Sequence, residues 1–322
     1  MASSEPSETP PFSSSATRPS HERTLSVLAV GTLAISTAAP FITLAKMHPL
    51  TLTAGRLLGV AVLYGVVGRD VLSQWKGLSP RYRRRLMFAT PLLTGHFACW
   101  IGAFSFTDLP SAVLLLVLQP LLASWFGSRV FREKVTPGIL GALALALVGL
   151  GLITYDDLTL SSAHLFGDLL VAVASLSMIG FLSVGKQLRP RLSFPAYMSL
   201  TYGGAGVWAL ALVLLFGVRV LGYPPASYGW LLGLILLTTG VGHAAINYVL
   251  PHMRLFTLNI TVVVEPVLAI VASVLFLGGS VTVAEVLGGA FLIAALLVGV
   301  RDETRARPAI RDESQADSVA RT

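Results

Sequence analysis

A glutamate directly before a proline stands out in the last third of the chain. Glu265 and Pro266 lie within a long apolar segment, where a carboxylate is unfavourable unless it is paired, protonated or hydrated. Pro266 cannot donate the backbone hydrogen bond to Val262, which leaves a carbonyl group for other partners. We interpret Glu265 as a protonatable group that faces a cavity and couples protons to solute movement. The alternative is a neutral acid hydrogen-bonded to a neighbouring helix.

Two histidines and a glutamine accompany this glutamate in other apolar segments. His96 and Trp100 are four residues apart, as are His243 and Asn247, so each pair shares one face of a helix. Histidine both donates and accepts hydrogen bonds and titrates near neutrality, which suits a binding or proton-relay role. Gln119, before Pro120, is expected to make an uncharged polar contact. We predict that these five residues bind substrate.

Each of these side chains also has a purely structural interpretation. The histidines can tie two helices together, and Trp100 can serve as packing rather than as a surface for a flat solute. Arg56 lies several residues into an apolar segment. We include it as a candidate for binding an anionic substrate group. We favour, however, that its long side chain extends to the outer membrane interface.

The segments that must position these residues are long and apolar. The chain has 322 residues, of which 54% are hydrophobic and 12% charged, about half the charged share of a soluble domain. A helix needs about 20 apolar residues to cross the hydrocarbon core. We therefore predict an all-α integral membrane protein with ten transmembrane helices, at residues 25–45, 51–68, 86–105, 110–130, 135–153, 167–185, 195–217, 227–249, 255–277 and 282–300.

The basic residues indicate the orientation of these spans. With the N-terminus inside, 20 of the 23 Lys and Arg residues fall on the cytoplasmic side, Lys46 and Arg219 fall outside, and Arg56 lies within a span. Such a bias is typical of cytoplasmic loops, so the net charge of +7 needs no nucleic-acid partner. We predict a multi-pass protein of the plasma (inner) membrane with both termini cytoplasmic.

The chain also repeats itself. Gly95-His96 followed by Gln119-Pro120 parallels Gly242-His243 followed by Glu265-Pro266, and Phe41 to Lys46 parallels Phe181 to Lys186. Each unit has five spans, so the second enters the membrane in the opposite sense. Inverted repeats are typical of secondary transporters, with the binding site near the midplane. The predicted organisation is a disordered cytoplasmic tail at 1–24, two inverted five-helix repeats at 25–153 and 167–300, an external linker at 154–166, and a disordered cytoplasmic tail at 301–322.

These motifs resemble the EamA-type transporters of the drug/metabolite transporter (DMT) superfamily. In the first half the resemblance rests on Phe41, Lys46, Pro49 and Arg56, then Gly95 to Ile101, Gln119-Pro120, Glu133 to Pro137 and Gly141. In the second half it rests on Gly242-His243, Asn247, Glu265-Pro266, Thr282 and Gly288. Gly279-Ser280 departs from the family, which often has Gly-Glu there. The resemblance implies a ten-helix fold and transport, commonly export, of a small metabolite.

Other functions find little support in the sequence. The chain has no HExxH motif, no Walker A motif and a single cysteine, Cys99, so we expect no enzyme activity, no metal site and no cofactor. A channel and a non-transporting membrane sensor remain as alternatives. The expected partners are the lipid bilayer, protons as the coupling ion and a small-molecule substrate such as an amino acid or amine. A homodimer stays open.

Overall fold

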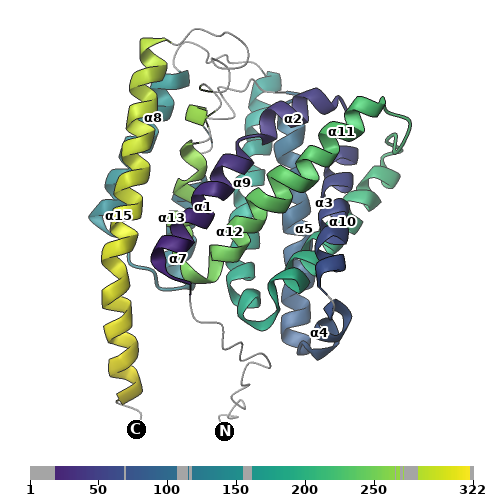
Figure 1. Ribbon diagram of the computed structural model, residues 1–322. Helices are drawn as coiled ribbons and strands as arrows, with labels where there is room; N and C mark the ends of the chain where they lie inside the picture. Colours follow the sequence, from purple (N-terminus) through teal and green to yellow (C-terminus); the bar gives the residue numbers. More distant parts are fainter. Residues whose placement is uncertain are drawn as a thin grey trace.

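The computed structural model describes residues 19–68, 70–106, 115, 118–154, 162–264, 266–268, 271 and 282–319. Within these ranges the protein is a bundle of helices (Figure 1), and each of the ten predicted segments contains helix. The helices are α1 (His21–Ile35), α2 (Ala38–Ala45), α3 (Pro49–Val67), α4 (Val71–Gly77), α5 (Pro80–Ala103), α7 (Leu118–Val130), α8 (Pro137–Thr154), α9 (Ser162–Leu188), α10 (Phe194–Leu215), α11 (Pro225–Gly233), α12 (Ala244–Val249), α13 (Leu255–Ile260) and α15 (Val283–Val319). A π-helical segment, η4 (Leu234–His243), joins α11 to α12, and short 3₁₀ turns occur at η3 (Arg189–Arg191), η5 (Leu250–His252) and η6 (Val262–Val264).

Local sequence explains where several helices begin. Pro49, Pro80, Pro137 and Pro225 each occupy the first position of a helix, where the missing N–H is not needed and the fixed φ angle is already helical. Ser20 caps α1 by accepting a hydrogen bond from the Arg23 amide. Helix starts of this kind are readable in the sequence, and all of them except Pro137 lie outside the predicted apolar spans.

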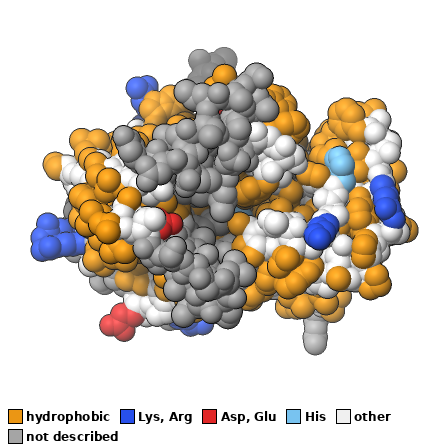
Figure 2. Space-filling view, turned by 90° about the horizontal axis from the view of Figure 1, so that it is seen from above, with side chains coloured by type: hydrophobic (Ala, Val, Ile, Leu, Met, Phe, Trp, Pro, Cys, Tyr) orange, Lys and Arg blue, Asp and Glu red, His pale blue; other side chains and the backbone are white. Residues whose placement is uncertain are grey.

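Seven helical stretches in the described part of the chain are long and apolar enough to cross a membrane. Their outer surfaces expose many large hydrophobic side chains, such as Leu215, Val283 and Leu297, as expected where lipid replaces water. Figure 2 shows hydrophobic atoms over most of the described surface at one end of the bundle, with few charged groups. These features identify a multi-pass membrane protein. The count of ten spans stays a prediction.

The two ends of the described chain lie towards the same end of the bundle (Figure 1). α1 begins and α15 ends at the lower end of the bundle in Figure 1. α15 is 37 residues long, well beyond the roughly 20 that cross a bilayer. It continues through residues 301–319, where a disordered tail was expected. That expectation is wrong for the first turn beyond Val300, because Asp302 and Glu303 form ion pairs with Arg254.

The helices that carry the candidate residues meet at close crossings. α1 packs against η4, and α5 packs against α9. At the first crossing a Cβ atom on Gly242 would lie 2.6 Å from Ile35 Cγ1 and 3.2 Å from the Gly31 carbonyl oxygen. Only a residue without a side chain allows this approach. The crossing therefore brings the end of α1 against the turn that carries His243.

Candidate functional site

A small cavity lies where elements from both predicted repeats meet. It is lined by Ile35, Ala38, Arg56, His96, Phe97, Trp100, Gln119, Met178, His243, Ile246 and Val262. Its volume is about 40 Å³, enough for a few water molecules but not for an organic metabolite. The structure therefore brings five of the seven candidate residues around one space, and this space must widen to admit a solute.

Arg56 lies inside the protein rather than at the outer interface. Its side chain is only 1% exposed, so the favoured interpretation of an interfacial anchor is wrong. Its Nε donates a hydrogen bond to Thr239 Oγ1 on η4, and its Cζ lies 4.4 Å from the centre of the Phe97 ring. Cation–π contacts of this kind become stronger when water is excluded. Thr239 and Phe97, from two other elements, are partners of the guanidinium that the hydropathy pattern alone does not reveal.

His96 lines the cavity from α5 and is fixed by the backbone of α9. Its Nδ1 lies 3.0 Å from the Ala174 carbonyl oxygen. A carbonyl oxygen only accepts, so Nδ1 carries the proton and donates it. In the neutral ring this leaves Nε2 as an acceptor. The structure thus places His96 both in the cavity wall and as a link between two helices, as its two interpretations predicted.

His243 is the counterpart of His96 in the predicted second repeat, but it lacks the matching bond. Its Nδ1 is buried and has no hydrogen-bond partner among the described residues. By the repeat spacing, the counterpart of Ala174 is Ala34. The Ala34 carbonyl, however, accepts a hydrogen bond of 2.7 Å from Thr37 Oγ1, where α1 ends and the chain bends into α2. The Ala34 carbonyl therefore already has a donor, whereas His243 Nδ1 has no partner among the described residues.

The remaining candidate residues divide into three cases. Trp100 and Gln119 are buried and line the cavity. Asn247 is buried but is not part of the lining, because its Nδ2 donates to the His243 carbonyl at 2.8 Å and to Tyr202 Oη at 3.3 Å. Glu265 lies outside the described residues.

Sequence reasoning missed the residues that orient these groups. Phe97 stacks under Arg56 and lies 5.0 Å from the His243 ring, centre to centre. Thr239 accepts from Arg56, and Tyr64 Oη donates to the Gly240 carbonyl at 2.7 Å. Both acceptors belong to the π-helical segment, and π-helical turns are frequent at functional sites. The small residues of Thr238 to Gly242 were the only sequence signal for this segment.

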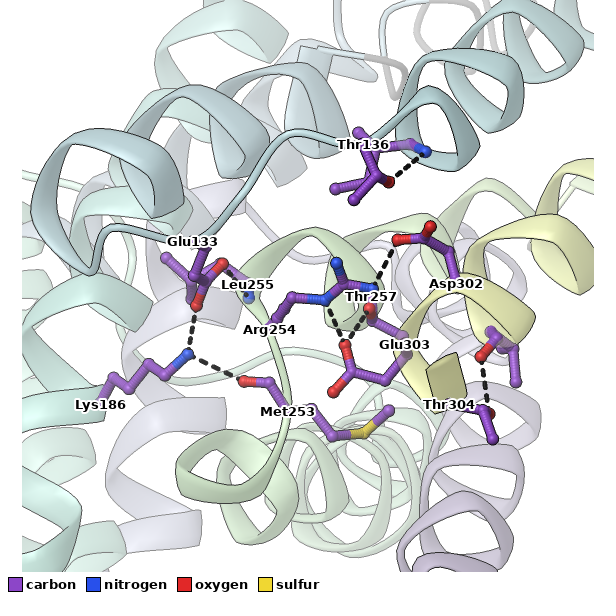
Figure 3. Close-up of polar contacts among 12 residues, drawn as sticks. Glu133, Thr136, Lys186, Met253, Arg254, Leu255, Thr257, Asp302, Glu303 and Thr304 are labelled. Carbon is purple, nitrogen blue, oxygen red and sulfur yellow. Dashed lines mark hydrogen bonds and ion pairs between the residues drawn. The ribbon is translucent and has the colours of Figure 1, made fainter. Parts of the chain in front are cut away.

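A second polar region, the ion-pair cluster, consists of Glu133, Lys186, Arg254, Asp302 and Glu303 (Figure 3). Lys186 Nζ contacts Glu133 Oε1 and donates to the Met253 carbonyl at 2.9 Å. The other oxygen of Glu133 accepts from the Leu255 amide at 3.2 Å. These contacts join the segment after α7 to the end of α9 and the start of α13.

Arg254 extends the cluster to α15. Its Nε lies 2.7 Å from Glu303 Oε2, and its Nη2 lies 2.8 Å from Asp302 Oδ2. Thr257 Oγ1 donates a further hydrogen bond of 2.8 Å to Glu303. Burial alone would lower the pKa of Arg254, but the hydrogen bonds and charges of Glu303 and Asp302 outweigh it and raise that pKa. Arg254 therefore stays charged.

The described residues contain no candidate metal site. In the parts of the chain that the structure describes, no group of three or more His, Cys, Asp or Glu residues could hold a metal ion. Cys99 is a free thiol. The expected absence of metal and cofactor stays a prediction.

Comparison with known proteins shows similarity to one family over part of the chain and to a known fold. Residues 165–301 match the model of the EamA-like transporter family. A protein of Archaeoglobus fulgidus named "Uncharacterized transporter" is 28% identical over 210 residues, which are 64% of this chain and 72% of that protein. A solved crystal structure superposes with a TM-score of 0.74 and 14% sequence identity, over 89% of this chain and 99% of the other. At that identity the structural match shows the shared fold alone.

Proposed function

We propose that this chain is a membrane transporter of the EamA type, as the motifs predicted and the sequence matches support, and that it is a secondary transporter working by alternating access. It exports a small organic metabolite, such as an amino acid or an amine, from the cytoplasm. The family and the name of the relative point to transport rather than catalysis. The observation that carries the proposal is the buried cavity, which combines polar side chains with walls from both halves of the chain.

The arrangement of helices supports two inverted repeats of five spans. Suppose that each span n is equivalent to span n+5. Exchanging the two repeats then turns the contact of α3 with α10 into itself, and the same holds for α7 with α13 and for α8 with α15. The contact of α5 with α9 maps onto that of η4 and α12 with α1. All of these contacts occur. The match of the family to residues 165–301 also suits a unit of five spans, and a cavity between the units is where such transporters bind solute.

The small size of the cavity supports movement rather than a fixed pore. With about 40 Å³ it holds water but no metabolite. A carrier needs a closed state of this kind between its two open ones. The π-helical segment next to His243 is a place where the helix can change its hydrogen-bond pattern, because its turns are already wider than those of an α-helix.

Transport by purified protein in proteoliposomes tests the proposal. A panel of amino acids, amines and other small metabolites is offered with and without a pH gradient. We expect at least one of them to move faster than in empty vesicles. If none does, the proposed function is wrong.

Proton coupling is tested in the same vesicles. Val262 lines the cavity and Pro266 is buried, and these neighbours in the sequence support the proposal that Glu265 acts at the site. Glu265→Gln should abolish the acceleration by the pH gradient while exchange without a gradient continues. Glu22→Gln, at an exposed position in the first turn of α1, is the matched control and should keep it. A Glu265→Gln protein that still responds to the gradient argues against this role.

A further inference from the structure

We propose that the corner formed by α4 and the start of α5 binds the phosphate group of an anionic membrane lipid. This corner, residues 70–85, lies at the lower end of the bundle in Figure 1, the end that the charge pattern predicts to be cytoplasmic. It is separate from the cavity and goes beyond the proposed transport function. Its charge, the fixed position of α4 and the apolar side chains beside the charges all support a lipid as the partner.

The α4–α5 corner is strongly basic. Its only acid is Asp70. Its five basic residues are Lys76, Arg81, Arg83, Arg84 and Arg85. The segment 189–193, which contacts α4 through Ser193, adds Arg189 and Arg191 and no acid. Basic side chains close to a membrane surface attract anionic lipids, so the local charge favours an anionic partner.

Contacts with two other helices fix the position of α4. The buried Gln74 donates from Nε2 to Ser193 Oγ at 3.0 Å, and its Oε1 accepts from the Ser193 amide at 2.8 Å. From α5, Arg83 Nε donates to the Trp75 carbonyl at 3.2 Å, and the same guanidinium donates to the Lys76 carbonyl. Because both ends of these contacts belong to helices of the bundle, the exposed side chains of α4 have a defined place beside α5.

Exposed charged and exposed apolar side chains lie next to each other on both helices. On α5, Arg84 is exposed, and Met87 and Phe88 are 62% and 61% exposed. They follow Arg84 by three and four residues and therefore share its face. On α4, Lys76 is exposed, and Leu72, four residues earlier, is 72% exposed. This change from charged to apolar side chains within one helical turn fits the boundary between lipid headgroups and acyl chains.

The Tyr82 ring brings two guanidinium groups together at this boundary. The Arg85 Cζ lies 5.3 Å from the centre of the ring, and the Arg191 Cζ lies 4.1 Å from it. Such cation–π contacts orient a guanidinium, and here they bring charge from α5 and from η3 to one place. A planar guanidinium donates paired hydrogen bonds to phosphate oxygens, so this arrangement suits the phosphate of a lipid headgroup.

The apolar side chains favour a lipid over a soluble anion. A soluble phosphate would contact only the charged side chains. A lipid held by its phosphate also places its acyl chains against Leu72, Met87 and Phe88, which are the exposed apolar neighbours of those charges. Surface binding of this kind gains from both the charge and the buried apolar area. A substitution of either kind should therefore weaken it.

Titration of the full-length protein in detergent with two lipids tests the proposal. Phosphatidylglycerol is anionic, whereas phosphatidylcholine has a phosphate but no net charge. The affinity for the first bound lipid is measured by native mass spectrometry. We expect phosphatidylglycerol to bind about tenfold or more tightly than phosphatidylcholine, because each basic side chain near the surface contributes a factor of about five. Equal affinity for the two lipids overturns the proposal.

A double variant assigns the preference to the corner. Arg84→Gln combined with Arg85→Gln should weaken binding of phosphatidylglycerol about ten- to thirtyfold. Arg129→Gln combined with Arg301→Gln removes the same charge from exposed positions on α7 and α15 and is the matched control. An equal loss in the control would show that only net charge matters and would contradict the site. Arg84→Gln alone, at an exposed position, should weaken binding about three- to fivefold and decides the test should the double variant not fold.

A change in the apolar part separates a lipid from a soluble anion. Leu72→Ser should weaken binding of phosphatidylglycerol about three- to tenfold, because the acyl chains lose an apolar contact. Leu215→Ser, 76% exposed at the far end of α10, is the control and should bind as wild type. Inorganic phosphate should not displace the lipid. Displacement by inorganic phosphate, or unchanged binding in Leu72→Ser, argues against the lipid. None of these measurements depends on transport, so their failure leaves the proposed function intact.

Discussion

Buried polar groups have different partners in the cavity and in the ion-pair cluster. In the cluster, Glu133, Asp302 and Glu303 each face a cation within hydrogen-bonding distance. In the cavity, His243 Nδ1 is buried without a partner among the described residues, and the wall combines Arg56 with two histidines. The described part of the cavity wall contains no carboxylate. The charges of the cluster are paired with one another, whereas one nitrogen of the cavity wall, His243 Nδ1, has no partner among the described residues.

This difference separates a stabilising region from a binding region. Saturated ion pairs hold helix ends together, and removing one partner leaves an unpaired buried charge. A buried nitrogen without a partner, as at His243, costs some stability, and such costs are common at functional sites. Substitutions should therefore affect mainly stability in the cluster and mainly function in the cavity.

The largest expected effect is a loss of stability when the ion-pair cluster loses its arginine. Arg254→Met leaves Asp302 and Glu303 without their cation, and the Glu303 side chain is only 4% exposed. Loss of one partner of a buried pair typically costs about 3–5 kcal/mol. We expect a clearly lower thermal unfolding midpoint of the purified protein in detergent.

The same variant makes a prediction about pH. The pKa of Arg254 is raised above its ordinary value by Glu303 and Asp302, so its stabilising contribution is fully present below the ordinary pKa of arginine and is lost only at still higher pH. The difference in stability between wild type and Arg254→Met should therefore stay constant from pH 7 to 9. A difference that shrinks over this range would show that another group governs the cluster. Arg191→Met, outside the cluster, serves as a control.

A smaller loss of stability is expected at the close crossing of α1 and η4, next to the cavity. In Gly242→Ala the new Cβ would meet the Ile35 side chain at 2.6 Å and the Ile35 amide nitrogen at 3.0 Å. The backbone must move, and such overpacking costs about 1–3 kcal/mol. Thermal unfolding should show a lower midpoint, and binding in the cavity should weaken.

A matched glycine provides the control for this crossing. Gly141 lies in α8, and nothing is within 4 Å of a Cβ atom placed there. Gly141→Ala should leave stability unchanged or raise it by up to about 1 kcal/mol, because alanine favours the helix. Equal losses in both variants would show that the close crossing is not what matters at Gly242.

Much of the fold was predictable because lipid exposure leaves a strong pattern. The predicted spans 51–68 and 195–217 correspond closely to α3 and α10. α5, however, begins at Pro80 rather than at residue 86, because five polar residues continue the helix beyond the apolar stretch. The π-helical segment could not be predicted, since it depends on contacts such as Thr37 Oγ1 with Thr238 Oγ1 at 2.7 Å.

The candidate site was predictable in its residues but not in its contacts. The repeated motifs pointed to His96, Gln119 and His243, and the structure places all three in the cavity wall. Hydropathy treats Arg56 as a charge near the end of an apolar segment, so the sequence alone favoured the interface. Its burial depends on Phe97 from another helix, a pairing that no spacing within one helix reveals.

The smallest expected effect distinguishes the two histidines. His96→Phe leaves the Ala174 carbonyl without its donor, which should destabilise the protein by about 1–2 kcal/mol. His243→Phe removes a buried Nδ1 that has no partner among the described residues, so we expect a change within about 0.5 kcal/mol. Thermal unfolding of the two variants, measured side by side, gives the comparison.

His243→Phe should affect transport much more than stability. We expect strongly reduced transport by a protein that is about as stable as wild type, because the solute loses a hydrogen-bonding group. An equal loss of stability in both variants would mean that His243 has a structural role like that of His96. In that case the unsatisfied nitrogen would no longer separate the cavity from the cluster, and the binding role would pass to Arg56 alone.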